Sequence, residues 1–255
     1  MTAATTGRGG WLADTWASLT DLVLPGGCAG CGRPGQPTRY GVCDACVATL
    51  AGLRPYATRP DPAPAGLPRC FALGEYHSVL GRLVLAYKDQ GRYRLARPLG
   101  RLLAEAVAGL VDAIGQPGAV VLVPVPDTPA AARARHGDHL WRLTRPAAAR
   151  LRAAGVGVTL AAPLRARAGV DSTQLSADQR AVRARATLGL RPARVAGLRR
   201  HLARTGEPVI LLDDVVTTGA TLAAAADRLA AAGVPVAGAA VLAATRRWGD
   251  SHSQW

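Results

Sequence analysis

The chain has 255 residues, of which 49% are hydrophobic, enough for the core of one α/β domain with or without a small appendage. Its 31 Lys and Arg residues against 17 Asp and Glu residues give a formal net charge of +14, which favours polyanionic partners such as phosphates or nucleic acids. No apolar run approaches the roughly 20 residues that a membrane span needs, so we expect no span.

The charge has a second interpretation that is equally good. Lys88 is the only lysine, so arginine supplies nearly all of the positive charge, as a coding bias towards arginine would produce on a solvated surface. The first apolar stretch contains Asp14 and Asp21 and lacks a basic start, which is atypical of a secretory signal. We therefore expect the protein in the cytoplasm.

The first predicted element is a short amphipathic helix. In WLADTWASLTDLVLP, residues 11–25, apolar side chains recur at helical spacing and the segment ends at Pro25. We expect this helix to pack on the body of the protein.

Two pairs of cysteines follow, in the segment CAGCGRPGQPTRYGVCDACV. Cys28 and Cys31 are separated by two residues, as are Cys43 and Cys46, and such doubled pairs are typical of metal ligands in a reducing compartment. Four thiolates favour a tetrahedral structural Zn²⁺ site. A redox dithiol would need only one pair, whereas an iron–sulfur cluster stays open as an alternative.

Residues 53–70, LRPYATRPDPAPAGLPRC, are rich in proline and predict a linker. We therefore predict two units, an N-terminal helix with a zinc finger at residues 1–60 and an α/β domain at residues 61–255. Cys70 stands apart from the two pairs and is interpreted as a buried core thiol.

From Cys70 onward the pattern alternates between strands and helices. Strands are predicted at 70–76, 119–126, 156–163, 208–214 and 235–244, and helices at 78–90, 94–114, from 127 to about 155, and at 220–233. An irregular polar stretch is predicted from Arg165 to Arg185. The alternation predicts a parallel sheet with helices on both faces and a ligand beyond the carboxyl ends of its strands.

The most informative segment is VILLDDVVTTGATL, residues 209–222. The pattern predicts a strand that leads into Asp213 and Asp214, and the Thr-rich turn that follows opens a helix whose free N–H groups and dipole suit a phosphate. The two acids need another partner, either the hydroxyls of a sugar or Mg²⁺. A ribose 5-phosphate satisfies both requirements, and a simple helix-capping turn explains only part of the pattern.

Two other phosphate-binding motifs are excluded by the sequence. Lys88 is flanked by Tyr87 and Asp89, so no Walker A Gly-Lys-Ser/Thr exists, and no GxGxxG follows a predicted strand.

The segment VILLDDVVTTGAT resembles the ribose-phosphate signature of type I phosphoribosyltransferases. Together with the cysteine pairs, the VLVPVP segment at 121–126, and Gln and Arg in the later polar loop, the chain resembles the ComF family, which is linked to competence for DNA uptake. The resemblance implies a type I phosphoribosyltransferase-like parallel sheet flanked by helices, preceded by a small zinc finger module.

The resemblance also implies roles for particular residues. Asp213 and Asp214 would contact the ribose hydroxyls of phosphoribosyl pyrophosphate as the catalytic acids, with Mg²⁺ as cofactor. The 5-phosphate would lie on the loop formed by Val215, Val216, Thr217, Thr218, Gly219, Ala220 and Thr221. The pyrophosphate would meet the turn at Pro126, Asp127 and Thr128, the lysine Lys88, and a closing loop that contains Arg165, Arg167, Gln174 and Arg180.

The sequence departs from the family pattern in two places. The segment RARHGDHL at 133–140 replaces the usual Arg-Gly-aromatic-Asn or -Asp, and Arg183 stands where Asn is frequent, so the resemblance assigns no role to Arg133, Arg135, Asp138 or His139. The acceptor of the phosphoribosyl group is not readable. Two functions are therefore predicted side by side: an enzyme that transfers a phosphoribosyl group, and a non-catalytic DNA-uptake accessory that binds single-stranded DNA or a motor ATPase and uses the ligand site as a sensor.

Overall fold

A computed structural model describes residues 27–135, 137–167 and 187–245 of the chain. The helix predicted at 11–25 and the loop positions Gln174 and Arg180 lie outside the described residues. The body is built on a six-stranded sheet: β3 (Tyr56–Thr58), β4 (Cys70–Glu75), β5 (Ala119–Pro124), β6 (Gly157–Leu160), β9 (Val209–Val216) and β10 (Val236–Ala244).

The strands of this sheet lie in the order β3-β4-β10-β9-β5-β6, and every neighbouring pair is parallel except β3 with β4. The three central strands are almost purely apolar because helices cover both of their faces. Along them, residues 120–123, 209–212 and 239–243 are at most 1% exposed. The predicted parallel sheet is therefore confirmed.

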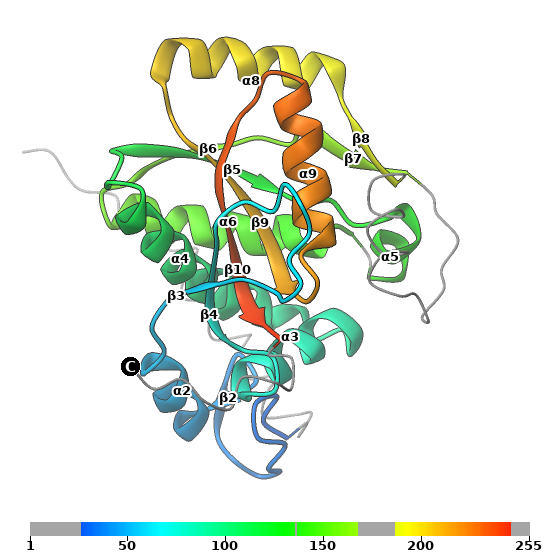
Figure 1. Ribbon diagram of the computed structural model, residues 1–255. Helices are drawn as coiled ribbons and strands as arrows, with labels where there is room; N and C mark the ends of the chain where they lie inside the picture. Colours follow the sequence, from blue (N-terminus) through cyan, green and yellow to red (C-terminus); the bar gives the residue numbers. More distant parts are fainter. Residues whose placement is uncertain (1–26, 136, 168–186, 246–255) are drawn as a thin grey trace, which may run out of the picture.

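Helices flank the sheet on both sides (Figure 1). Helices α4 (Ala96–Ala113) and α6 (His139–Ala153) pack against one another on one face, and α9 (Ala220–Ala231) lies on the opposite face. Helix α8 (Pro192–Thr205) lies beyond the amino ends of β9 and β10, whereas α3 (Val79–Asp89) and the short 3-10 turn η1 (Tyr93–Leu95) lie towards the carboxyl ends. No helix in the described ranges is long and apolar enough to cross a membrane.

The helix predicted from residue 127 to about 155 is wrong as a single element. The structure has two helices there, α5 (Pro129–Ala134) and α6, which begins at His139. Gly137 has a φ of 132°, and the Asp138 side chain accepts a hydrogen bond from Trp141 N at 2.9 Å. This capping interaction starts a new helix, so the break places His139 at the first position of α6.

Three further segments differ from the expectations. The proline-rich segment predicted as a linker contributes β3, an edge strand that pairs with β4, where proline in the flanking chain is tolerated. The predicted irregular stretch begins with β7 (Leu164–Ala166), which pairs with β8 (Leu188–Leu190), and α8 follows β8. The hydrophobic pattern of the sequence does not predict these elements, because β7 and α8 bury few residues and most of their side chains are exposed or half-buried.

The cysteine-rich segment forms a small module at the carboxyl end of the sheet (Figure 1). It consists of the two-residue strands β1 (Thr38–Arg39) and β2 (Val42–Cys43) and helix α2 (Asp44–Ala51). Arginines of the body hold it: Arg82 donates to the Gly30 carbonyl, and Arg92 donates to the Gly27 carbonyl at 2.8 Å. Hydrogen bonds from one arginine within α3 and one after its end to backbone carbonyls of the module thus hold the module against the body.

Candidate functional site

A cavity of about 450 Å³ opens at the carboxyl ends of β5 and β9, where a parallel sheet is expected to bind its ligand. Residues from three regions line it: the end of β4 with α3, the loop after β5 with the start of α6, and the end of β9 with the start of α9. The lining residues are Tyr76, Val84, Leu85, Lys88, Asp89, Val125, Pro126, Asp127, Thr128, Ala131, His139, Asp213, Asp214, Val215, Thr217 and Thr221.

The start of α9 lies on the side of this cavity where the sequence predicts a phosphate. Gly219 has a φ of 73°, which reverses the chain between β9 and the helix, and a Cβ there would lie 2.9 Å from Leu67 Cδ1. The first backbone hydrogen bond of the helix is donated by Ala223 N to Gly219 O at 2.9 Å. The amides that precede Ala223 lie in the turn, where an anion can accept hydrogen bonds from them. Thr217 and Thr221 are exposed and add hydroxyl groups at the cavity wall.

The two adjacent acids have different surroundings. Asp214 is 3% exposed, and its Oδ2 accepts from His139 Nε2 at 2.8 Å and pairs with Lys88 Nζ at 2.8 Å. Asp213 is half-buried and its Oδ1 accepts the Asp214 N–H at 2.9 Å, while no described cation pairs with its carboxylate. Asp213 is therefore the acid that is available to a ligand.

These surroundings shift the two carboxyl pKa values in opposite directions. Burial, followed by the negative charge of Asp214, raises the pKa of Asp213 to about 7. Burial also opposes ionisation of Asp214, but the hydrogen bond and charge of His139 and the charge of Lys88 outweigh it and hold its pKa well below the usual range.

The turn after β5 is tied to the same network. Asp127 Oδ2 accepts from the His139 N–H at 3.1 Å and from the ring Nδ1, and Asp127 Oδ1 pairs with Arg135 at 3.3 Å. Burial raises the pKa of Asp127, but the bonds with His139 outweigh it and lower the pKa overall. Thr128 caps α5 by accepting from Ala131 N at 3.3 Å. The turn is thus positioned by the start of both following helices.

The structure brings together some of the predicted site residues but not all. The cavity is lined by the predicted residues Lys88, Pro126, Asp127, Asp213, Asp214, Val215, Thr217 and Thr221. Val216 and Ala220 are buried in the elements beside it, and Thr218 and Gly219 shape the turn without lining the cavity. Arg165 in β7 and Arg167 beside it do not line the cavity.

Sequence reasoning gave no role to His139, which the structure places between Asp127 and Asp214. The signal in the sequence was the departure at RARHGDHL, where a histidine follows an acid immediately before an apolar helical pattern. That pattern identifies a helix start, but it does not identify the partners of the ring.

A larger hollow of about 840 Å³ lies at the opposite end of the sheet, between α8 and the amino ends of β9 and β10. It contains none of the predicted site residues, and its lining is mostly apolar, with Arg199, Arg200 and Glu207 as its charged residues. We therefore place the candidate site at the carboxyl ends of the strands despite the smaller volume.

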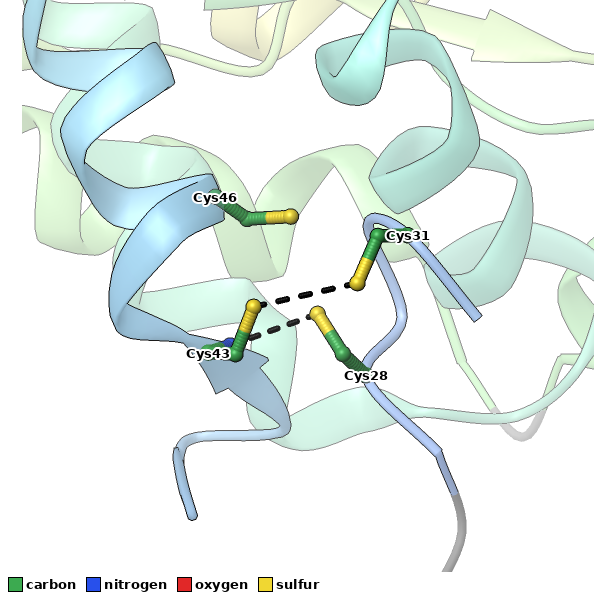
Figure 2. A group of neighbouring side chains, drawn as sticks. All are labelled: Cys28, Cys31, Cys43 and Cys46. Atoms are coloured by element: carbon green, nitrogen blue, oxygen red, sulfur yellow. Dashed lines mark hydrogen bonds between the residues drawn. The ribbon is translucent and has the colours of Figure 1, made fainter. Parts of the chain in front are cut away.

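A second candidate site is the group of four cysteines in the N-terminal module (Figure 2). Their Sγ atoms all lie within 4.8 Å of one another, and the Sγ atoms of Cys31 and Cys43 are 3.8 Å apart. Four thiolates at about 2.3 Å from a Zn²⁺ ion would be separated by about 3.8 Å, so the donor set fits a tetrahedral metal site. None of the cysteines forms a disulfide.

The surroundings of Cys28 favour the thiolate form, which is the form that binds a metal cation. The Cys28 Sγ accepts backbone N–H groups from Gly30 and Cys43, each at 3.3 Å. Burial opposes ionisation of Cys28, but these and other donors outweigh it and lower its pKa to about 6. Cys70 lies apart, 2% exposed in β4, as expected for a core thiol.

Comparison with known families agrees with the geometry of the cavity. Residues 156–253 match the phosphoribosyl transferase domain, a span that includes β9, the turn at Gly219 and α9. The chain matches no curated protein. The chain is thus an α/β protein with a mostly parallel central sheet, and residues 156–253 of it are similar to a phosphoribosyl transferase domain. The chain also carries the four-cysteine module, which lies at the carboxyl end of the sheet.

Proposed function

We propose that the chain binds phosphoribosyl pyrophosphate in the cavity between β5 and β9. One observation carries the proposal: β9, which carries Asp213, runs through the turn at Gly219 into the amino end of α9, and Asp213, Thr217 and Thr221 from this segment line one cavity. The acid suits the diol of a ribose, and the helix start suits its 5-phosphate. The loop at Pro126 and Asp127, on the other side of the cavity, would meet the pyrophosphate.

The residues present also fit Mg²⁺, which phosphoribosyl pyrophosphate binding is expected to require. The Asp213 carboxylate is half-buried in the cavity wall and has no described cation within ion-pair distance, so it is free to hold the ion directly or through the ribose hydroxyls. When bound, Mg²⁺ would neutralise charge on the pyrophosphate.

The proposed reaction is displacement at C1 of the ribose. A bond from an acceptor nitrogen or oxygen to C1 forms while the bond from C1 to the pyrophosphate oxygen breaks, and pyrophosphate leaves with the electron pair. Developing positive charge on the sugar ring favours a nearby carboxylate, which Asp213 supplies. Lys88, Arg165, Arg167 and Arg180 are proposed to neutralise the pyrophosphate, and Gln174 is proposed to contact it. The roles of Arg165, Arg167, Gln174 and Arg180 rest on the family resemblance alone.

At a finer level, we propose a ComF-like protein associated with DNA uptake that acts in the cytoplasm, where its thiolates stay reduced. The support is the combination of the phosphoribosyl transferase match with a four-cysteine module in one chain. We propose Zn²⁺ as the metal of this module and 1–60 and 61–255 as the two units, although β3 already joins the sheet of the second unit.

Calorimetry with phosphoribosyl pyrophosphate and Mg²⁺, followed by pyrophosphate release across a panel of bases and amines, tests the proposal. We expect binding that is weakened in Asp213→Asn and retained in Glu105→Gln, the same acid-to-amide change on the exposed face of α4. Binding that is equal in all three proteins would refute the site, and binding without pyrophosphate release would favour a non-catalytic role.

The non-catalytic alternative has one observation of its own. Helix α8 with its cap carries five exposed arginines and no acidic residue between Arg191 and Gly206, namely Arg191, Arg194, Arg199, Arg200 and Arg204. Such a face suits single-stranded DNA or an acidic surface of a motor ATPase. Arg194→Gln with Arg204→Gln should flatten the dependence of single-stranded DNA affinity on salt by about 0.7 per lost contact. An unchanged slope would remove α8 from the interface.

A further inference from the structure

The strongest unassigned feature is the buried side chain of His139. It is the first residue of α6, it is 4% exposed, and its two ring nitrogens face carboxylates from two different parts of the chain. Nδ1 bonds to Asp127 in the loop after β5, and Nε2 lies 2.8 Å from Asp214 Oδ2 at the end of β9. The ring therefore spans the floor of the cavity from the predicted pyrophosphate side to the predicted ribose side.

Both contacts require the ring to donate a proton. A carboxylate can only accept, and a neutral imidazole has only one N–H, so bonds from both nitrogens to ionised acids need the imidazolium form. The surroundings favour that form: burial opposes the charge, but the bonds to Asp127 and Asp214 outweigh burial and raise the pKa of His139 to about 9.

The other charged groups around the ring belong to the same network. Lys88 on α3 shares the Oδ2 atom of Asp214, and Arg135 pairs with Asp127. Asp138 caps α6 beside the ring, and Tyr87 donates its hydroxyl to the His139 carbonyl at 2.8 Å. Within the described residues, three cationic side chains thus hold Asp127 and Asp214 in place, and His139 is the one that touches both acids.

From this arrangement we infer that His139 is a positioning residue that fixes the distance between the pyrophosphate loop and the ribose acids. By occupying Asp214 together with Lys88, it also leaves Asp213 as the acid that meets the ligand. The inference rests on the proposed function for the identity of the ligand, but the link between the two parts of the chain does not depend on any ligand.

A fixed distance matters because phosphoribosyl pyrophosphate would be held at both of its ends. When two binding groups are held at the correct separation, the second contact is intramolecular and strengthens binding greatly. If the separation can vary, each half still binds its own group, but the advantage of holding both is reduced. A positioning role therefore predicts a loss that is specific to the complete ligand.

The test compares the complete ligand with its halves. In His139→Gln, with Mg²⁺ present, we expect the affinity for phosphoribosyl pyrophosphate to fall at least about tenfold. The affinities for inorganic pyrophosphate and ribose 5-phosphate, each measured alone, should change less than about threefold, and Glu105→Gln serves as the matched control. An equal loss for all three ligands, or no loss for the complete ligand, would overturn the inference.

A second measurement in ligand-free protein separates this inference from the proposed function. Unfolding of the parent, His139→Gln, Asp127→Asn and the double variant forms a double-mutant cycle. We expect the double variant to lose less stability than the sum of the single variants, because either change already breaks the link. Additive losses would refute the link. A parent that binds no phosphoribosyl pyrophosphate would contradict the proposed function, and the cycle would still decide whether His139 and Asp127 are linked.

If His139→Gln does not fold, His139→Asn replaces it in the ligand comparison, because the shorter amide also removes the link between the two acids. The same loss specific to the complete ligand is then expected, and an equal loss for pyrophosphate and ribose 5-phosphate alone would overturn the inference.

Discussion

Asp213 and Asp214 are neighbours in the sequence, but their side chains do different work. Asp214 shares its Oδ2 atom between two cations and is almost fully buried, whereas Asp213 faces the cavity without a described cationic partner. The pKa of Asp213 is raised and that of Asp214 is lowered, so neutralising each residue should have a different result.

Asp213→Asn should weaken phosphoribosyl pyrophosphate binding by roughly 1.5–3 kcal/mol for the lost charge-assisted hydrogen bond. The same substitution should stabilise the ligand-free protein at high pH. Because folding raises the pKa of Asp213 from 3.8 to about 7, the stabilisation from its protonated form is complete below about pH 4 and lost as pH rises through 7. The variant should therefore melt at a higher temperature than the parent at pH 8, and parallel melting profiles from pH 4 to 8 would contradict this.

Asp214→Asn should instead destabilise the ligand-free protein at pH 7, because His139 and Lys88 lose the charge that they share. Removing one partner of a buried ion pair costs about 3–5 kcal/mol. Folding lowers the pKa of Asp214, so its contribution is present above the unfolded value of 3.8 and is lost in more acidic solution. Thermal melts of both Asn variants at pH 7 should show opposite shifts, and equal shifts would disprove the division of roles.

The last turn of α3 places Lys88 where a compact cation reaches Asp214 Oδ2 at 2.8 Å while 31% of its side chain stays exposed to the cavity. Arginine is longer and its planar group is wider. Lys88→Arg should lower phosphoribosyl pyrophosphate affinity at least tenfold, about 1.4 kcal/mol, without changing the melting temperature of the ligand-free protein. Titration of the Arg variant decides this, and binding as tight as in the parent would limit Lys88 to its ion pair with Asp214 and exclude it as a specific ligand contact.

The turn between β9 and α9 depends on one glycine. Gly219 has a positive φ, and a Cβ there would lie 2.9 Å and 3.0 Å from the two Leu67 methyl carbons. Gly219→Ala should lower stability by about 1–2 kcal/mol from the backbone conformation alone. The change should appear as a lower melting temperature together with weaker phosphate binding. Gly197→Ala, within α8 and with nothing within 4 Å, is the control and should be neutral or stabilising. A similar shift in both variants would contradict the proposed strain.

At the scale of the whole molecule, the four-cysteine module is joined to the body by arginines that bond its backbone carbonyls at Gly27 and Gly30. Purified protein should contain one Zn²⁺ per chain, and Cys28→Ser or Cys46→Ser should lose it and destabilise the module, because metal binding contributes directly to folding. Cys70→Ala should keep the metal, since Cys70 lies in β4 outside the group. Metal analysis that finds iron, or no metal in freshly reduced protein, would refute zinc.

Many of the elements were predictable from local patterns. Apolar runs and helical spacing identified β4, β5, β6, β9 and β10 with α3, α4 and α9, because buried strands and amphipathic helices carry those patterns in any fold. The missed elements, β3, β7, β8 and α8, are short or bury few side chains, so tertiary pairing rather than hydrophobic pattern decides them.

The residues of the two candidate sites also differ in how far the sequence could predict them. Asp213, Thr217 and Thr221 of the cavity could be predicted to lie near one another, and so could the four cysteines, because each group is set by neighbours within a few residues, at a strand, a helix start or a two-residue turn. The position of His139 between Asp127 and Asp214 depends on residues that are 12 and 75 positions away in the sequence. It also depends on the interruption between α5 and α6 at Gly137, which places the start of α6 at the cavity. Only the packing of α6 against the sheet brings these charges together, because it sets the first residue of α6 between an acid of the loop after β5 and an acid of β9. A buried imidazolium needs such charged partners to be stable.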